Sequence, residues 1–374
     1  SLSPVPLAEG SLFRRFFRGD ALWPAVFLAE RRKPPGPQAA GCERRIERIG
    51  AIGIGVIALV WILANVIHSP QQFAQVSLLG LRNGLLYALI ALGYTLVYGI
   101  IELINFAHGD LFMLSTLFSS YFITIWFKQQ NSNPAGWITF VACLFAVMAF
   151  GATINVLIER FAYRRLRNAP KLAPLITAVG MSFLLNFIGL KWNGSTPRQW
   201  PIVIPSFDIH IAGVAINMVT ILLFLVGAPL LLALNYVVNN TKQGKAMRAT
   251  AQDKDAASLM GINVNKTIAF TFALGGAMAG AAGLFYQQAI GTTNYNLGFQ
   301  LGLIAFTSAV LGGIGNLWGA VVGALLIGLI QGLNDGLPIA LGQQWSQSVV
   351  FTILIIILVF KPAGLLGKVT TEKV

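Results

Sequence analysis

Ten long apolar segments, almost free of charged side chains, most strongly limit what this chain can fold into. Only 10% of its residues are charged and 56% are hydrophobic, a balance that a soluble domain of this size does not show. Because about 20 apolar residues cross a bilayer as a helix, we predict an all-α polytopic membrane protein with about 8–10 transmembrane helices. The segments are residues 50–67, 79–101, 109–127, 135–158, 172–191, 211–236, 267–288, 297–312, 317–334 and 346–360.

The basic residues are distributed unevenly between the two sides of this threading. With residue 1 inside, 22 of the 26 Lys and Arg residues fall on the inner side, in residues 1–48, 159–171, 240–267 and 361–374. Cytoplasmic loops carry such an excess, so we expect both termini in the cytoplasm. The net charge of +13 is therefore a topology signal. It does not indicate nucleic-acid binding, because no basic segment carries interleaved aromatic residues on a folded domain.

Two interruptions divide apolar stretches that a plain span would leave continuous. The first has the sequence ELINFAHGD at residues 102–110, and the second has GGIGNLWG at residues 312–319. Non-helical backbone at membrane depth needs cover from protein or from a water-filled cavity. We predict two shorter helices over residues 297–334 that meet at the cytoplasmic side, and broken or re-entrant segments at both interruptions.

Few polar side chains lie inside the predicted spans, and those near the first interruption allow two interpretations. The freed backbone and nearby polar side chains can line a translocation path. Alternatively Asp110 lies in the first turn of the next helix, where the helix dipole favours an acid. We favour a gate or packing role over direct substrate binding. The candidates for the path or gate are Asn105, His108, Gly109, Asp110, Thr95, Thr307 and Ser308.

The sequence offers no pattern for a metal site, a cofactor or catalysis. Three isolated histidines, of which His68 and His210 fall on the side opposite His108, do not form a ligand set. The two cysteines are far apart in the chain and predict no disulfide framework. The phosphate-binding pattern G-x-x-x-x-G-K-[ST] does not occur, so the chain cannot bind ATP by that route. We expect a protein that is not an enzyme.

A polar run at residues 240–267 predicts a short helix followed by a turn at Gly261, since glycine tolerates the positive φ that ends a helix. Small side chains make its surface shallow enough for a groove in a partner protein, and nearby charges can pair with that partner. The other interpretation is an ordinary solvated connection, and the loop alone favours it. The docking residues under the first interpretation are Arg248, Asp255, Ala256, Ala257 and Gly261.

Several motifs, in order along the chain, resemble the permease subunits of branched-chain amino acid ABC transporters. They are YALIALGYTLVYGI at 87–100, INFAHGD at 104–110, AASLMGIN at 256–263 and VFKPAGLLG at 359–367. Agreement of several ordered motifs is far more specific than any one of them. The stretch from Asp255 to Gly261 is also similar to the coupling motif of importer permeases, Glu-Ala-Ala-x-x-x-Gly, with Asp in place of Glu. The resemblance therefore favours the docking helix.

The resemblance implies a transmembrane permease subunit of an ATP-driven importer for branched-chain or other hydrophobic or neutral amino acids, in the bacterial inner membrane. It implies four kinds of partner besides the lipid bilayer: a second homologous permease, two cytoplasmic ATP-binding-cassette subunits and a periplasmic amino-acid-binding protein. It also divides the chain. Residues 1–48 form a basic N-terminal extension, residues 49–70 an extra transmembrane helix and residues 71–368 the permease domain.

Alternative functions remain open at this point. A permease for urea or short amides belongs to the same superfamily, although Phe106 favours the amino-acid branch. An ion-coupled secondary transporter is expected to carry paired acidic residues in the membrane core, and none lies securely there. A channel-like or purely structural subunit leaves the loop at residues 245–263 without an explanation.

Overall fold

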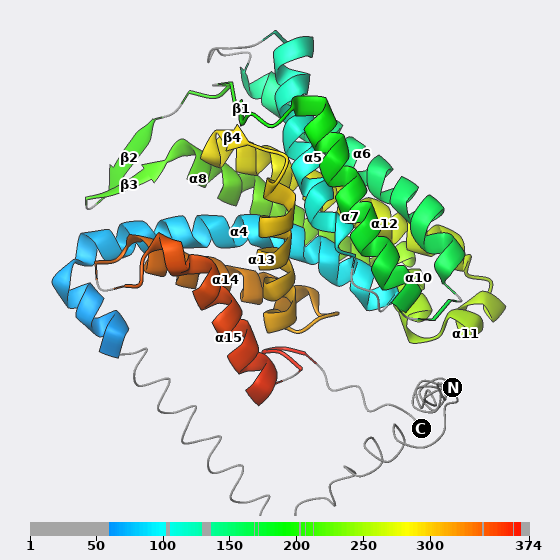
Figure 1. Ribbon diagram of the computed structural model, residues 1–374. Coiled ribbons are helices and arrows are strands. Elements are labelled where there is room, and N and C mark those ends of the chain that lie inside the picture. Colours follow the sequence, from blue (N-terminus) through cyan, green and yellow to red (C-terminus); the bar gives the residue numbers. More distant parts are fainter. Residues whose placement is uncertain are drawn as a thin grey trace, which may run out of the picture. The chain divides into compact units, whose positions relative to one another are not determined.

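The computed structural model describes residues 60–101, 105–128, 136–167, 169–170, 172–201, 203–205, 207–211, 213–338, 340–361 and 363–367. The chain divides into two compact units, Ser1–Trp61 and Ile62–Val374. The expected N-terminal extension at residues 1–48 and the first half of the expected extra helix at 49–70, residues 49–59, lie outside the described residues. The account below concerns the second unit (Figure 1).

Helices make up nearly all of this unit, as predicted. Several follow the predicted apolar segments closely, and two of them, α13 and α15, have the predicted bounds. The helices are α4 (Pro70–Ile101), α5 (Ala107–Tyr121), α6 (Gly136–Ile158), α7 (Leu172–Asn193), α8 (Met218–Leu222), α9 (Ala228–Asn240), α10 (Lys242–Gln252), α11 (Lys254–Leu259), α12 (Val264–Ile290), α13 (Leu297–Gly312), α14 (Leu317–Gly336) and α15 (Ser346–Phe360). π-Helical turns at Phe122–Trp126, Glu159–Tyr163 and Leu223–Gly227 extend or join them.

Two small antiparallel ribbons depart from the all-α prediction. Strand β1 (Arg198–Gln199) pairs with β4 (Thr292–Thr293), and β2 (Asp208–Ile211) pairs with β3 (Val214–Asn217). The segment predicted as a helix from residue 211 instead includes the end of β2 and the whole of β3, and its helix α8 begins only at Met218. Polar and apolar residues alternate along β2 in the two-residue period of a strand, and Gly213 between β2 and β3 has φ +81°. Asn217 then caps α8 by accepting a hydrogen bond from the Val219 amide over 2.9 Å.

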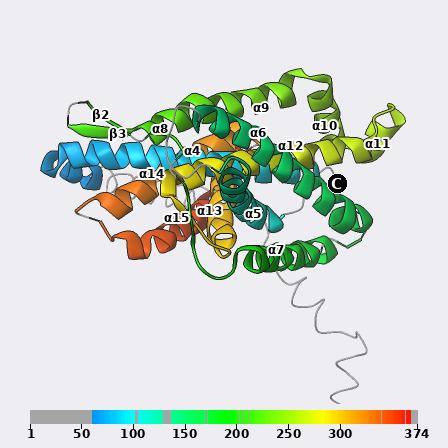
Figure 2. The ribbon, with the colours of Figure 1, turned by 90° about the horizontal axis from the view of Figure 1, so that it is seen from above.

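Helix α4 lies at the centre of the unit and packs against α14, α12 and α13. Its close approach to α14 depends on glycine, because a Cβ added at Gly328 would lie 2.3 Å from the Gly84 Cα atom. Small residues at such crossings allow transmembrane helices to associate through van der Waals contact. In the view from above, α8 and α9 flank one side of this centre and α7 flanks the other (Figure 2). Among the long apolar helices, α4 and α12 are the most buried.

Six described helical segments are long and apolar enough to cross a membrane: Pro70–Ile101, Gly136–Leu166, Leu172–Asn193, Met218–Asn240, Val264–Ile290 and Leu317–Gly336. Two shorter apolar helices, Leu297–Gly312 and Gln343–Val359, accompany them. The protein is thus a multi-pass membrane protein. Its β2–β3 ribbon and its α10–α11 hairpin lie at opposite ends of the unit in both ribbon views (Figures 1 and 2).

The first helix of this set differs from the prediction at its start. We expected a span from residue 79, which would place Arg82 near a helix end, where a long side chain reaches the interface. The helix instead begins at Pro70, so Arg82 lies more than three turns inside it. The first turns of α4, residues 70–78, contain several polar side chains, so hydropathy alone understates the length of this helix.

Candidate functional site

The polar loop between α9 and α12 folds into a hairpin of two short helices, α10 and α11. Asp253 separates them and caps α11, because its Oδ1 atom accepts hydrogen bonds from the amides of Asp255 (2.8 Å) and Ala256 (2.9 Å). At the other end, the Gly261 amide donates to the Ser258 carbonyl and the Ile262 amide to the Ala257 carbonyl. These paired bonds across a glycine at φ +80° form a Schellman motif, which fixes where α11 stops.

The outward surface of α11 is more apolar than the sequence interpretation assumed. Leu259 is 88% exposed and Met260 is 83% exposed, while Ala256 is also on the surface. Ala257, which we expected to face a partner, is 4% exposed and packs inside the chain. Two adjacent large apolar side chains are therefore exposed on a loop outside the apolar spans. This surface, residues 256, 259 and 260, is called the α11 knob below.

Arg248 has a different partner from the one predicted. We expected it to pair with a charge on another protein. Its guanidinium instead donates to the carbonyl oxygens of Val238 and Asn239, the latter over 3.1 Å. These carbonyls belong to the last turn of α9, where backbone carbonyls have no amide partner within the helix. Arg248 therefore ties α10 to the end of the preceding span and orients the hairpin.

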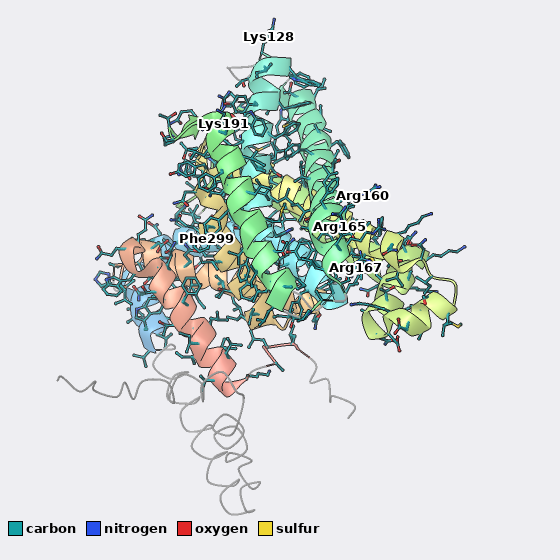
Figure 3. All side chains as sticks on the ribbon, turned by 45° about the vertical axis from the view of Figure 1, so that its right-hand side comes forward. Lys128, Arg160, Arg165, Arg167, Lys191 and Phe299 are labelled. Carbon is teal, nitrogen blue, oxygen red and sulfur yellow. The ribbon has the colours of Figure 1, made fainter. Side chains whose placement is uncertain are left out.

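A second basic segment lies beside the hairpin. The buried Glu159, in the π-helical turn after α6, forms an ion pair with Arg167, and Arg167 also donates to Asn265 Oδ1 over 2.5 Å at the start of α12. Figure 3 shows Arg160, Arg165 and Arg167 together at the end of α6 near the hairpin, with Lys128 and Lys191 toward the opposite end. Two loops that are distant in sequence thus gather their basic residues at one end of the molecule.

The first interruption, the predicted gate, is connected to this same turn. Tyr163 donates from its hydroxyl to Asn105 Oδ1 over 3.0 Å, and both side chains are buried. Asn105 also lines a small hollow with Tyr94 and Phe306. The volume of this hollow is about 10 Å³, which is room for about one water molecule. In this conformation the Asn105 side chain bonds Tyr163 and does not face an open path.

The other residues of the predicted gate are buried in helix packing. The His108 ring meets the Tyr94 ring edge-on at a centroid distance of 4.8 Å. Gly109 sits where α5 crosses α13, since an added Cβ would lie 2.4 Å from the Gly298 carbonyl oxygen. Asp110 lies in the first turn of α5 and accepts a hydrogen bond from the Ser182 hydroxyl. The structure thus brings these three residues to one crossing of α4, α5, α7 and α13.

The three hydroxyl candidates face no common opening. Thr307 and Ser308 each donate back to a carbonyl of their own helix over 2.8 Å, to Leu303 and Ile304 respectively. Thr95 is 2% exposed, and its hydroxyl has no hydrogen-bond partner among the described residues. Their burial inside one chain means that a path past them requires either movement or a second chain.

The second interruption is covered in a way that the sequence did not indicate. The amides of Leu365 and Leu366 donate to the carbonyls of Leu311 and Gly312 over 2.8 and 3.0 Å, at the end of α13. Asn316 caps α14 and also donates to the Leu366 carbonyl over 2.9 Å. The C-terminal segment 363–367 therefore supplies partners for backbone groups that the break between α13 and α14 leaves free.

Sequence reasoning missed four contacts: the Glu159–Arg167 pair, the Tyr163–Asn105 bond, the cover by residues 363–367 and the Arg248 tether. Only the first had a local signal, an acid directly after an apolar segment with an arginine two turns later. The described residues contain no group of three or more His, Cys, Asp or Glu residues placed to hold a metal.

Comparison with known proteins gives a consistent result. The family model described as the permease component of branched-chain amino acid transport systems matches residues 77–359. A high-affinity branched-chain amino acid transport permease of Pseudomonas aeruginosa, BraD, is 37% identical over 318 residues, covering 83% of this chain and 100% of the relative. LivH of Escherichia coli K12 is 38% identical over 307 residues, covering 81% and 98%. A probable LivH of Methanocaldococcus jannaschii is 28% identical, covering 75% and 89%. No solved structure matches the chain.

Proposed function

This chain belongs to the family of branched-chain amino acid transport permeases, and we propose that it moves branched-chain or similar neutral amino acids across the bacterial inner membrane with a second permease subunit. As a permease subunit of an ABC importer it draws on ATP hydrolysis by partner subunits. The observation that carries the proposal is the α11 knob. A capped surface helix with two large apolar side chains exposed at its end is suited to binding a partner protein.

The ATP-binding subunits dock on this knob. Leu259 and Met260 supply apolar anchors, and Asp255 and Lys254 on the exposed side of α11 supply rim charges. Met suits such a contact because its flexible thioether adapts to an irregular groove. Arg248 and Ala257 act differently, since they hold the hairpin against the rest of the chain. Two of the five predicted docking residues are thus positioning residues within this proposal.

Movement of the knob reaches the first interruption through a short series of contacts. Helix α11 leads directly into α12, whose Asn265 contacts Arg167, and Arg167 pairs with Glu159. Tyr163 belongs to the same π-helical turn as Glu159 and bonds Asn105 at the interruption. π-Helical turns recur at functional sites because their backbone is less regular and can rearrange. Closure of the ATP-binding subunits thereby alters the packing at Asn105.

The end that carries the knob faces the cytoplasm, and both termini lie on that side. The clustering of Arg160, Arg165 and Arg167 near the hairpin supports this orientation, because cytoplasmic loops retain basic residues (Figure 3). The β-ribbons then lie on the outer side, where an amino-acid-binding protein delivers its cargo. Transport proceeds by alternating access, in which ATP binding favours the outward-facing state and hydrolysis restores the inward-facing one.

Purification of the chain from its native membrane, in a mild detergent, tests the proposal. The expected result is an assembly with two ATP-binding subunits per pair of permease chains, whose ATP hydrolysis rises when a loaded binding protein is added. Isolation of the chain as a stable oligomer without ATP-binding subunits, in a preparation that transports leucine on an ion gradient, contradicts it.

A further inference from the structure

An open polar cavity on the proposed outer side has no part in the packing described so far. Its volume is about 430 Å³, within the range of roughly 300–1,000 Å³ that small-molecule sites occupy. It lies between the first half of α4, the β2–β3 ribbon, the start of α8 and the end of α12. Its lining combines two opposite charges with an apolar wall and includes Arg82, Asp208, Gln288, Leu79, Val219 and Ala289.

Arg82 is the unusual member of this lining. It lies inside an apolar helix and is partly buried, and its hydrogen bonds among the described residues go only to the neighbouring Asn83 Oδ1, over 3.4 Å. Bonds of that length leave most of the five guanidinium donors free. A cation inside a membrane helix is costly and is retained where it has a function. The guanidinium fork matches a carboxylate, which it can bind through two parallel bonds.

Asp208 supplies the complementary charge at the exposed rim. One oxygen of its carboxylate accepts a hydrogen bond from Asn217 over 2.9 Å, and the other has no partner among the described residues. The ribbon that carries Asp208 is held against α4, because Gln75 donates to the Ala215 carbonyl over 2.9 Å and accepts from its amide over 2.8 Å. The Asp208 carboxylate is therefore held at the rim of the cavity that Arg82 also lines.

The apolar wall completes the match to one class of ligand. Leu79 lies on the same face of α4 as Arg82, one turn earlier, and Val219 and Ala289 come from α8 and α12. Two nearby side-chain amides already have partners, since Gln288 accepts from the Trp200 indole over 2.8 Å and Asn217 donates to Asp208 over 2.9 Å. The cavity thus offers one cation, one anion and a wall of branched and small apolar side chains.

We infer that this cavity is an entry subsite for the zwitterion of a neutral amino acid, in which Arg82 binds the carboxylate, Asp208 binds the ammonium group and the Leu79–Val219–Ala289 wall receives the apolar side chain. The inference rests on the proposed function and adds to it the place where the permease first holds its substrate. An acidic side chain of the docking binding protein is the other carboxylate that could reach Arg82, and the experiment separates the two.

The test uses the assembled complex in lipid nanodiscs, without the binding protein, and L-photo-leucine, the diazirine analogue of leucine. Irradiation followed by peptide mass spectrometry should place labels on the segments that contain Leu79, Val219 and Ala289. Excess L-leucine should suppress labelling. 3-Methylbutylamine and 4-methylpentanoate, which each lack one of the two charges, should not. Labelling elsewhere, or equal suppression by both analogues, overturns the inference.

Variants identify the charge that holds the ligand. Arg82→Gln should reduce labelling roughly 10-fold, the scale of one lost charge-assisted hydrogen bond, while Arg82→Lys retains part of it. Lys191→Gln removes a matched cation outside the cavity and should change nothing. Unchanged labelling in Arg82→Gln together with weaker docking of the binding protein would assign Arg82 to that protein and overturn the subsite.

The inference and the proposed function fail in different ways. If the complex assembles and its ATP hydrolysis responds to the loaded binding protein, but photo-leucine does not label the cavity, only the subsite is wrong. If Arg82→Gln does not assemble, Val219→Trp provides a second test, because the larger side chain fills the cavity from its apolar side. An assembled Val219→Trp complex that still labels as the parent chain does contradicts the inference.

Discussion

The backbone amide of Ile262 donates to the carbonyl oxygen of Ala257 over 3.1 Å, across the glycine that ends α11. This bond, with the one from Gly261 to Ser258, sets the direction in which the chain leaves the helix. It leaves Leu259 and Met260 at the exposed turn while Ala257 stays packed. The geometry of one loop therefore decides which side chains a partner meets.

Gly261→Ala should impair coupling without blocking insertion of the chain. An added Cβ meets no atom within 4 Å, so the cost is the positive φ alone, about 1–2 kcal/mol. Gly194→Ala is a matched control, because Gly194 has the same φ of +80° with equally open surroundings after the end of α7. We expect a lower ATP-dependent uptake rate for Gly261→Ala than for Gly194→Ala. Equal rates would show that the α11 turn has no special role.

Replacing Leu259 and Met260 together by serine should weaken binding of the ATP-binding subunits by roughly 10-fold or more, as loss of interface anchors does. Both side chains are exposed, so the thermal midpoint of the isolated chain should stay the same. Leu341→Ser, at a 63% exposed position near the start of α15, is the control. Retained affinity in the double variant contradicts docking at the knob.

Arg167→Gln should destabilise the chain by roughly 3 kcal/mol, because it leaves the buried Glu159 carboxylate without its partner. Arg160→Gln alters an exposed arginine on the same turn and should stay within about 0.5 kcal/mol of the parent chain. Thermal unfolding in detergent measures both. Similar midpoints for the two variants would mean that the Glu159–Arg167 pair contributes no stability.

Asn316→Ala should cost about 0.5–2 kcal/mol, since the cap of α14 is lost. Asn316→Asp keeps the capping oxygen but loses the amide donor to Leu366. We expect proteolysis of the C-terminal segment to speed up in both variants, while unfolding shifts mainly in Asn316→Ala. Protection of the segment in Asn316→Asp would show that the Leu366 bond is dispensable for its attachment.

The sequence allowed the spans to be placed well, but not the contacts between them. Apolar length predicted α13 and α15 with their observed bounds, because their ends coincide with turn residues. It missed the first nine residues of α4, where polar side chains lie on a helix that packing still stabilises. Which alanine of the α11 pair is buried, and which carbonyls Arg248 reaches, depend on neighbours that are distant along the chain.

For the candidate gate too, the sequence predicted the local structure but not the contacts with distant residues. The sequence indicated a break near Asn105 with Asp110 in the first turn of the following helix, and the structure has that arrangement. It gave no sign that Tyr163, 58 residues away, would bond Asn105. Whether Asn105 and its neighbours act as a gate stays a prediction, and Tyr163→Phe is the change that addresses it, through the rate of ATP-dependent uptake.

Docking of the ATP-binding subunits on α11 is the central claim, and site-specific cross-linking tests it most directly. A photoreactive p-benzoylphenylalanine at Met260, in the complex within its native membrane, should cross-link to an ATP-binding subunit on irradiation. The same group at Leu341 should not. Absence of that cross-link from position 260, in a complex that retains its ATP-binding subunits, would contradict the account.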